Sequence, residues 1–233
     1  MNFLLINSNE NEAFAAISEN DRLHLVKAAD YENGSGSISG SPAGASVKAG
    51  RSPDKLINCL VKLRTEYDFV NIDAISVTVG PGSFTGIRVG LALAKGIAGR
   101  LDKKIIRINN FLLQYERIPD KKLNGKFCIL IPAKEPEYYY AVIEKNEIQS
   151  YGSLRIDEME KIIEKNTIIA GNLGDDSVLK HRYFTFIDLK KDAIDESDAM
   201  LRLTTGYFKD NKLTAPEKVE PVYIKEFLYK KSL

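Results

Sequence analysis

Residues 76–99 read SVTVGPGSFTGIRVGLALAKGIAG, in which a β-rich run leads into a glycine-rich turn and then into an apolar helical pattern. The turn lacks the Gly-Lys-Ser/Thr ending of a Walker A loop, and its G-x-G-x-x-x-G spacing differs from that of the dinucleotide fingerprint. Pro81 and Thr85 stand where a G-x-S-x-G nucleophile elbow needs glycine. The stretch therefore predicts a strand, a tight turn and a helix, and its spacing excludes a dinucleotide-dependent oxidoreductase.

The predicted helix is apolar on nearly every side, with Arg88 and Lys95 as its only charges before Gly99. Small residues recur every four positions along it and form one smooth stripe: Gly86, Gly90, Ala94 and Ala98. A helix of this kind is buried on several sides. Two interpretations stay open at this point: a central core helix, or a helix with one face on its own sheet and another on a partner subunit.

A second helix is predicted to begin at 52–54, which read Ser-Pro-Asp. Serine suits the N-cap, proline the first helical position, and aspartate the positive end of the helix dipole. Leu56, Leu60 and Leu63 then recur at helical spacing and form one apolar face.

The order of the predicted elements repeats along the chain. Strands come first, helices then alternate with strands, and the same order begins again at about Asn109. Strands are predicted at 3–6, 13–17, about 24–29, 72–79, 104–108, 127–131, 138–143, 167–170 and 183–187, and further helices at about 111–117, 156–163 and 195–209. This order predicts an α/β protein with two lobes, residues 1–108 and 109–216.

Residues 34–46 read GSGSISGSPAGAS and show no hydrophobic periodicity. A segment of this composition is typical of a flexible exposed loop, and it also resembles an engineered linker. No helix follows directly, as a phosphate-binding loop would require, so we assign this segment no chemistry.

The composition is that of an ordinary globular protein, with 44% hydrophobic and 28% charged residues among 233. The 33 basic and 32 acidic residues give a net charge of +1, which argues against nucleic-acid or membrane binding driven by total charge. Two histidines and two cysteines, at no ligand-like spacing, argue against a zinc site, and Cys59 and Cys128 are expected to be buried thiols of a reducing cytosol. We expect no metal site, no membrane span and a cytoplasmic location.

Residues 80–98, GPGSFTGIRVGLALAKGIA, resemble the signature of the TsaB family, also called YeaZ. Residues 220–225, EPVYIK, are similar to the closing E-P-V-Y-[LI]-[RK] segment of that family. The N-terminal strand–turn–strand lies where the family has a degenerate first phosphate motif. The resemblance is close over 70–108 and 216–225. Between those two ranges the chain resembles the family only in its architecture.

The resemblance implies the two-lobed actin/Hsp70/sugar-kinase-like (ASKHA, ribonuclease H-like) fold, in which the C-terminal segment, here 217–233, returns to the first lobe. It implies a non-catalytic subunit that dimerises with a TsaD-like catalytic subunit to make threonylcarbamoyladenosine (t6A) beside the tRNA anticodon. It also implies a TsaE-like ATPase in the same complex, tRNA contact only through the complex, and homodimers through the same surface. ATP or ADP at the subunit interface is the one cofactor that it suggests.

The family's interface corresponds here to the helices 53–66 and 85–98. The expected interface residues are Leu56, Leu60, Leu63, Gly86, Ile87, Gly90, Leu91, Ala94 and Ala98. The residues of the glycine motif are Gly80, Pro81, Gly82, Ser83, Phe84, Thr85, Gly86 and Arg88. No catalytic residue is expected in this chain.

The chain departs from the family where a nucleotide site would need carboxylates. Asn7 stands where relatives usually carry aspartate, and 131–134 read Ile-Pro-Ala-Lys where relatives usually read I-D-A-R. A Mg²⁺–nucleotide site needs such oxygen ligands to offset the charges of the cation and the phosphates. These changes disfavour the alternative function, an active nucleotide-dependent phosphotransferase or ATPase of the same fold.

Overall fold

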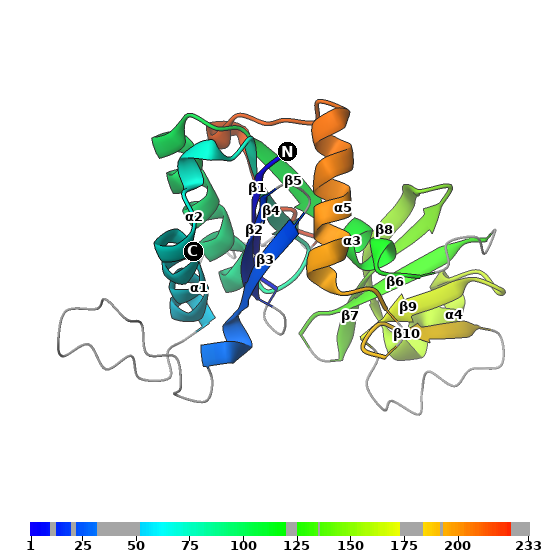
Figure 1. Cartoon of the computed structure of the whole chain (residues 1–233). Helices are drawn as coiled ribbons and strands as arrows, with labels where there is room; N and C mark the ends of the chain where they lie inside the picture. The colour runs from blue at the N-terminus through cyan, green and yellow to red at the C-terminus, as the bar shows by residue number, and fades with distance from the viewer. Residues whose placement is uncertain are drawn as a thin grey trace, which may run out of the picture. The chain divides into compact units, whose positions relative to one another are not determined.

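The computed structural model describes residues 1–9, 13–19, 22–31, 52–119, 125–134, 136–172, 184–191 and 193–224. The chain divides into two units, each with its own sheet (Figure 1). The first unit comprises Met1–Leu113 and Asp195–Pro221, and the second comprises Gln114–Ile194 and the chain from Val222 onward. The expected α/β class with two units is confirmed.

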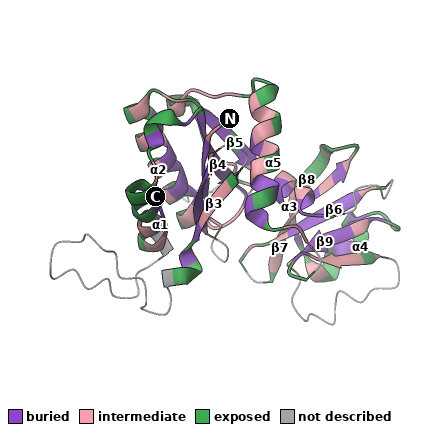
Figure 2. Ribbon diagram, viewed as in Figure 1, coloured by how far each residue is buried: buried purple, intermediate pink, exposed green. Residues whose placement is uncertain are grey.

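The first unit is built on a mixed sheet with the strand order β3-β2-β1-β4-β5. Strands β1 to β3 form an antiparallel meander, whereas β4 and β5 run parallel to β1. Their bounds are β1 Phe3–Asn7, β2 Phe14–Glu19, β3 Arg22–Lys27, β4 Ala74–Gly80 and β5 Ile105–Asn109. β1 and β4 are buried along their whole length, as expected of strands with helices on both faces (Figure 2).

Helices cover both faces of the first sheet (Figure 1). On one face, α1 (Ser52–Glu66) packs on β2, and α2 (Phe84–Leu101) packs on β4 and against α1. On the other face, α5 (Glu196–Lys209) packs on β1 and β5. Among the described residues, none of the helices combines the length and apolar character needed to cross a bilayer.

The second unit repeats the strand order of the first. Its sheet has the order β10-β9-β6-β7-β8, with β6 to β8 antiparallel and β9 and β10 parallel to β6. The strands are β6 Phe127–Pro132, β7 Glu137–Glu144, β8 Glu147–Arg155, β9 Ile168–Gly171 and β10 Thr185–Asp188, and the helices α3 Asn110–Glu116, at the junction of the units, and α4 Met159–Ile162. The element order predicted to occur twice is therefore confirmed, although β8 was not predicted.

The predicted lobe boundaries differ from the structure at two places. The helix predicted at 195–209 was assigned to the second lobe, but α5 belongs to the first unit. Ala199 and Met200 pack in one apolar cluster with Phe3 and Leu5, and Thr204 makes a buried 2.7 Å hydrogen bond with Ser76. These contacts span most of the chain, so the order of elements could not reveal them.

The closing segment also differs from its expected place. It was predicted to join the first lobe over 217–233; residues 217–221 lie in the first unit, whereas 222–224 are grouped with the second. Residues 34–46 and the end of the chain after Ile224 lie outside the described residues.

Helix α2 lies very close to the sheet because Gly90 faces it. A Cβ atom added to Gly90 would be 2.8 Å from Cβ of Ser8, which follows β1, and 3.8 Å from a methyl of Val77 on β4. A side chain larger than the hydrogen atom of glycine fits in that space only if Ser8 moves. Gly96, by contrast, has no such neighbour within 4 Å in the described part of the chain.

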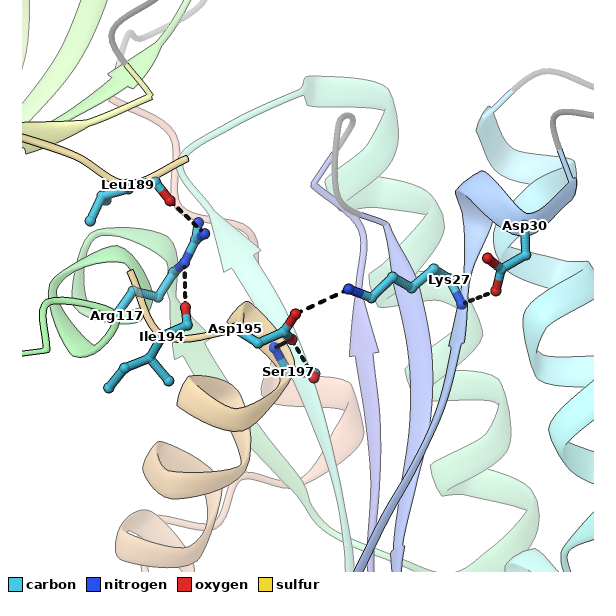
Figure 3. A network of polar contacts seen from close by, with 7 residues as sticks. All are labelled: Lys27, Asp30, Arg117, Leu189, Ile194, Asp195 and Ser197. Atoms are coloured by element: carbon cyan, nitrogen blue, oxygen red, sulfur yellow. Dashed lines mark hydrogen bonds and ion pairs between the residues drawn. The ribbon is translucent and has the colours of Figure 1, made fainter. Parts of the chain in front are cut away.

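The N-terminus of α5 is capped by Asp195, whose carboxylate accepts hydrogen bonds from Ser197 N (2.9 Å), Ser197 Oγ (2.6 Å) and Lys27 Nζ (3.0 Å) (Figure 3). Burial raises the pKa of this carboxyl, but the hydrogen bonds from Ser197 and Lys27 outweigh burial and bring the pKa below its usual value. The ion pair itself contributes about 0–1 kcal/mol, since both side chains are about half exposed.

The residue before this cap is held separately within the second unit. The carbonyl oxygen of Ile194 accepts Nε of Arg117 at 3.2 Å, and the carbonyl oxygen of Leu189 accepts Nη2 of the same arginine at 2.9 Å (Figure 3). Arg117 is buried, and its guanidinium also donates to Oε1 of Gln114 at 2.9 Å. The chain passes from the second unit to the first between Ile194 and Asp195, and each of these two residues makes side-chain hydrogen bonds within its own unit.

We expect Asp195→Ala to lower the free energy of unfolding by about 1 kcal/mol at neutral pH, because it removes an N-cap. A carboxyl whose pKa is lowered by folding stabilises the protein above its unfolded pKa of about 4, and this contribution is lost as the pH falls. The difference from wild type, measured by urea unfolding, should therefore shrink towards pH 3. Asp198→Ala, which removes an exposed acidic residue of the same first turn, is the control; equal losses in both variants would contradict the capping role.

We expect Gly90→Ala to destabilise the protein by about 1–3 kcal/mol, because the added methyl group has no room beside Ser8. Gly96→Ala on the same helix should stabilise it by up to about 1 kcal/mol, because alanine is the better helix former and the position is open. Chemical unfolding followed by circular dichroism measures both. If both variants changed the free energy of unfolding in the same direction, α2 would have to be rotated differently on the sheet.

Candidate functional site

The glycine motif forms the turn between β4 and α2, as predicted. Gly80, the last residue of β4, has a φ of 101°, a value that favours glycine. Ser83 caps α2, since its Oγ accepts Gly86 N at 3.4 Å. The turn thus ends a central strand and sets the starting point and direction of the helix.

The small stripe of α2 faces the protein's own sheet. Ile87, Gly90, Leu91, Ala94 and Ala98 are the buried residues of this helix. At Gly86, which is half-buried, an added Cβ would collide with the main-chain oxygen of Ser8. The stripe therefore packs within the core, as both interpretations left open for this helix require of one of its faces.

The predicted interface residues of α1 are buried as well. Leu56, Leu60 and Leu63 are 2%, 6% and 1% exposed. The predicted interface residues thus lie on the inner faces of α1 and α2, where they have little surface to offer a partner: Leu56, Leu60, Leu63, Gly86, Ile87, Gly90, Leu91, Ala94 and Ala98. Helical spacing grouped them correctly, but it could not tell which group meets the sheet.

The outward sides of the two helices carry a second, exposed set of apolar and small residues. Ile57 and Val61, one turn apart on α1, are 41% and 42% exposed. On α2, Ala92 and Gly96 are exposed one turn apart. We call these four residues the outer helical face. The spacing of Ile57 and Val61 was the available sequence signal, since both fall one residue after a buried leucine.

The outer helical face is bordered at the start of α2 by residues of the glycine motif. Phe84 is 37% exposed, and the guanidinium of Arg88 lies 3.7 Å from the centre of its ring. Thr85 is exposed beside them. Aromatic and arginine side chains are enriched at the energetically important positions of protein interfaces. The motif therefore contributes to both sides of α2: glycine to the inner side, and Phe84 and Arg88 to the surface.

A separate polar cluster lies at the carboxyl ends of the parallel strands β1, β4 and β5. Nδ2 of Asn9 donates to Oε1 of Glu196 at 2.8 Å. Nδ2 of Asn110 donates to Oδ1 of Asn9 at 2.5 Å and to the carbonyl oxygen of Pro81 at 2.8 Å. Ligands of open α/β sheets bind at this edge, so these residues are the natural candidates for a binding site.

This cluster presents acceptors and a carboxylate to any ligand. Nδ2 of Asn110 makes two donations to protein acceptors and Nδ2 of Asn9 makes one, Oδ1 of Asn110 is buried with no hydrogen-bond partner among the described residues, and Glu196 is 4% exposed. Asn7, at the end of β1, accepts the main-chain N–H of Asn9 at 3.2 Å. A phosphate is bound most strongly by cations, and these side chains supply none. Within the described residues, no three His, Cys, Asp or Glu side chains gather as around a metal ion.

The two cysteines are buried, as expected. Burial raises the pKa of Cys59 to about 11 and that of Cys128 to about 12. Because the thiolate is the nucleophile, neither residue is suited to covalent catalysis at neutral pH. His24 accepts or donates a 2.7 Å hydrogen bond with Tyr67 Oη and stacks on its ring, which gives it a structural partner.

Known proteins match large parts of this chain. A family model described as TsaD: tRNA N6-adenosine threonylcarbamoyltransferase matches residues 54–210, more than half of the chain. The chain is 23% identical over 168 residues to the tRNA threonylcarbamoyladenosine biosynthesis protein TsaB of Escherichia coli K12, covering 66% of this chain and 71% of that protein. It is 31% identical over 122 residues to a tRNA N6-adenosine threonylcarbamoyltransferase of Clostridium perfringens, covering 50% of this chain and 36% of the relative.

Among solved structures, YeaZ from Pseudomonas aeruginosa superposes with a TM-score of 0.69 at 16% identity, covering 95% of this chain and 99% of that one. This similarity confirms the expected two-lobed fold over both units. The chain spans about a third of the clostridial transferase but almost all of the YeaZ structure. The chain therefore belongs to the family of the TsaD model, and within that family to its TsaB (YeaZ) members.

Proposed function

We propose that the chain is a non-catalytic partner subunit in t6A biosynthesis, which docks through the outer helical face onto a TsaD-like catalytic subunit and thereby supports threonylcarbamoyl transfer to tRNA. The observation that carries the proposal is the exposed pair Ile57 and Val61 on α1 together with the exposed small residues of α2, the helix packed against it, in a chain of the TsaB (YeaZ) type. Membership of the family supports a role in t6A biosynthesis.

The outer helical face suits a helical partner. Burying two half-exposed side chains such as Ile57 and Val61 contributes on the order of 1 kcal/mol each, given roughly 1.5–3 kcal/mol for complete burial. Ala92 and Gly96 allow a partner helix to approach the backbone of α2 closely, because nothing projects there. Half-buried Val89 and Leu93 on neighbouring positions of α2 add apolar area.

In the proposed complex the TsaD-like subunit carries out the threonylcarbamoyl transfer. The edge of the first sheet that would bind a nucleotide in this fold presents Asn7, Asn9 and Asn110, whose amides are neutral and hydrogen-bonded to the protein. Glu196, the one carboxylate that the described part of the chain places in this cluster, would repel a phosphate. These contacts favour a supporting role over the alternative phosphotransferase or ATPase.

The other components of the proposed complex come from the resemblance. They are a TsaE-like ATPase and tRNA, which would contact the chain only through the complex. ATP or ADP at the subunit interface belongs to the same set of expectations. None of these requires a catalytic residue in this chain.

Reconstitution tests the proposed function directly. The purified full-length chain is mixed with the TsaD-like subunit of the same organism, the complex is followed by size-exclusion chromatography, and t6A formation is measured with all components present and with this chain omitted. We expect a complex and a loss of t6A on omission. No complex together with unchanged t6A would refute the proposal, and Mg²⁺-ATP turnover by the chain alone would favour the alternative function.

We expect Ile57→Asp to weaken the complex at least about tenfold, because it places a charge in the apolar contact, and to leave the fold intact, because Ile57 is on the outer side of α1. Ile162→Asp is a matched control, since Ile162 on α4 of the second unit is also 41% exposed. Titration calorimetry measures both, with circular dichroism as a check of folding. Equal binding by the two variants would show that the outer helical face is not the contact.

A further inference from the structure

One buried amide oxygen beside the glycine turn has no partner in the described part of the chain. Asn110, the first residue of α3, is 1% exposed, and its Nδ2 donates to Oδ1 of Asn9 and to the carbonyl oxygen of Pro81. Oδ1 of the same amide accepts no hydrogen bond there. Because buried polar atoms are nearly always satisfied, this oxygen indicates a further donor or a cation as part of the cluster.

The neighbours of Asn110 decide which way its amide points. If the amide were turned over, its oxygen would face Oδ1 of Asn9 and the carbonyl oxygen of Pro81, so three acceptors would lie together without a proton between them. In the orientation observed, both of these acceptors receive a hydrogen bond. The unpartnered oxygen therefore follows from the network around it.

The cluster also carries a negative charge. Nδ2 of Asn9 donates to Oε1 of Glu196 at 2.8 Å, so one side chain joins the amide of Asn110 to a carboxylate that is 4% exposed. The four residues that these hydrogen bonds connect, Asn9, Pro81, Asn110 and Glu196, contain one carboxylate and no basic side chain. A carboxylate this near favours a cation over a neutral donor at Oδ1 of Asn110.

Gly82 keeps side-chain atoms away from the two amides. A Cβ atom at this position would lie 3.2 Å from Nδ2 of Asn110 and 3.6 Å from Oδ1 of Asn9, so even a methyl group would press on the cluster. Gly82 and Asn9 are half-buried, whereas Asn110 and Glu196 are buried. The partly exposed side of the cluster is therefore the side of Gly82 and Asn9.

The oxygen atoms of the cluster suit a monovalent cation. Neutral carbonyl oxygens replace the hydration shell of potassium in proteins. Calcium sites gain affinity from additional carboxylates, and magnesium combines carboxylates with substrate phosphates. Within the residues that the structure describes, no three His, Cys, Asp or Glu side chains gather as around such an ion. The single carboxylate of Glu196 balances one positive charge.

We propose that this cluster binds a monovalent cation, with Oδ1 of Asn110 as an oxygen ligand and the carboxylate of Glu196 as the balancing charge. The residues involved come from the end of β1, the turn before α2 and the first residues of α3 and α5, all of which belong to the first unit. A bound cation therefore stabilises the first unit by connecting four of its segments. The site does not depend on docking through the outer helical face.

Potassium titration of the full-length chain tests the proposal without any variant. We expect the Tm to rise by about 3–5 °C for each tenfold increase in KCl above the Kd, relative to the same concentrations of choline chloride. Choline chloride matches the ionic strength, and its quaternary ammonium group is too bulky for a site between side chains. The same titration with NaCl covers the other common monovalent ion. Equal Tm values in all three salts would overturn the proposal.

Diffraction locates the ion directly. Thallium(I) takes the place of potassium and scatters anomalously, so crystals of the full-length chain grown with thallium(I) nitrate should show an anomalous difference peak beside Oδ1 of Asn110. A water molecule can also satisfy a buried oxygen. Density for a water at this atom, with no anomalous signal, would overturn the proposal.

Two variants test the named groups. Glu196→Gln keeps an acceptor for Asn9 and removes the charge, so we expect the affinity for potassium to fall at least about tenfold and the thallium peak to disappear. Gly82→Ala should also weaken binding, because its methyl group presses on the amide of Asn110. Asp198→Asn is the matched control, since Asp198 is an exposed acidic residue in the same first turn of α5.

The results separate the cation site from the proposed function. Asp198→Asn and the docking variant Ile57→Asp should respond to potassium as wild type does, even if the second no longer binds the TsaD-like subunit. A wild-type potassium response in Glu196→Gln, or an equal loss in Asp198→Asn, would refute the assignment of the balancing charge. Near-UV circular dichroism shows whether each variant keeps its native packing. If Glu196→Gln does not fold, the wild-type titration and the thallium peak decide the question.

Discussion

The close approach of α2 to the end of β1 decides most of what this protein presents to its surroundings. Gly90 leaves no room for a side chain against Ser8, and this contact fixes how α2 is rotated about its own axis. Once the small stripe is on the inner side, the residues about half a turn away form the surface. The exposed Ala92 and Gly96, and the cations around them, are therefore a consequence of how the core is packed.

Much of the fold could be predicted because it depends on local patterns. The continuous apolar run of β4, the glycines of the turn and the N-cap of α1 each have a cause within a few residues. The stripe from Gly86 to Ala98 was also recognised as one face of a helix. Whether the stripe faces the sheet or the surface could not be predicted, because α2 has two sides that tolerate close contact. The choice between these sides depends on Ser8, some eighty residues earlier in the chain. Helical periodicity defines faces but does not say what each face meets.

The same limit explains the misplaced helix α5. The sequence order places 196–209 after the strands of the second sheet, and nothing in its own pattern distinguishes one sheet from the other. Met200 completes an apolar cluster with Phe3 and Leu5, and Thr204 makes a buried hydrogen bond with Ser76 on β4. These are long-range contacts, and they also bring Glu196 to Asn9, so the polar cluster could not be assembled from local spacing either.

The glycine motif illustrates how a turn that looks suited to phosphate binding can serve packing and orientation instead. Its Pro81 carbonyl accepts Asn110, its Ser83 caps α2, and its Gly86 lets the first turn of the helix lie against the main chain of Ser8. Each contact faces the protein, so the turn is fixed by the elements around it rather than by a ligand. What remains exposed, Phe84 and Arg88, lies at the end of the outer helical face. The residues that make the motif recognisable thus set the position of α2, and its two exposed side chains extend the surface through which we propose that this helix docks.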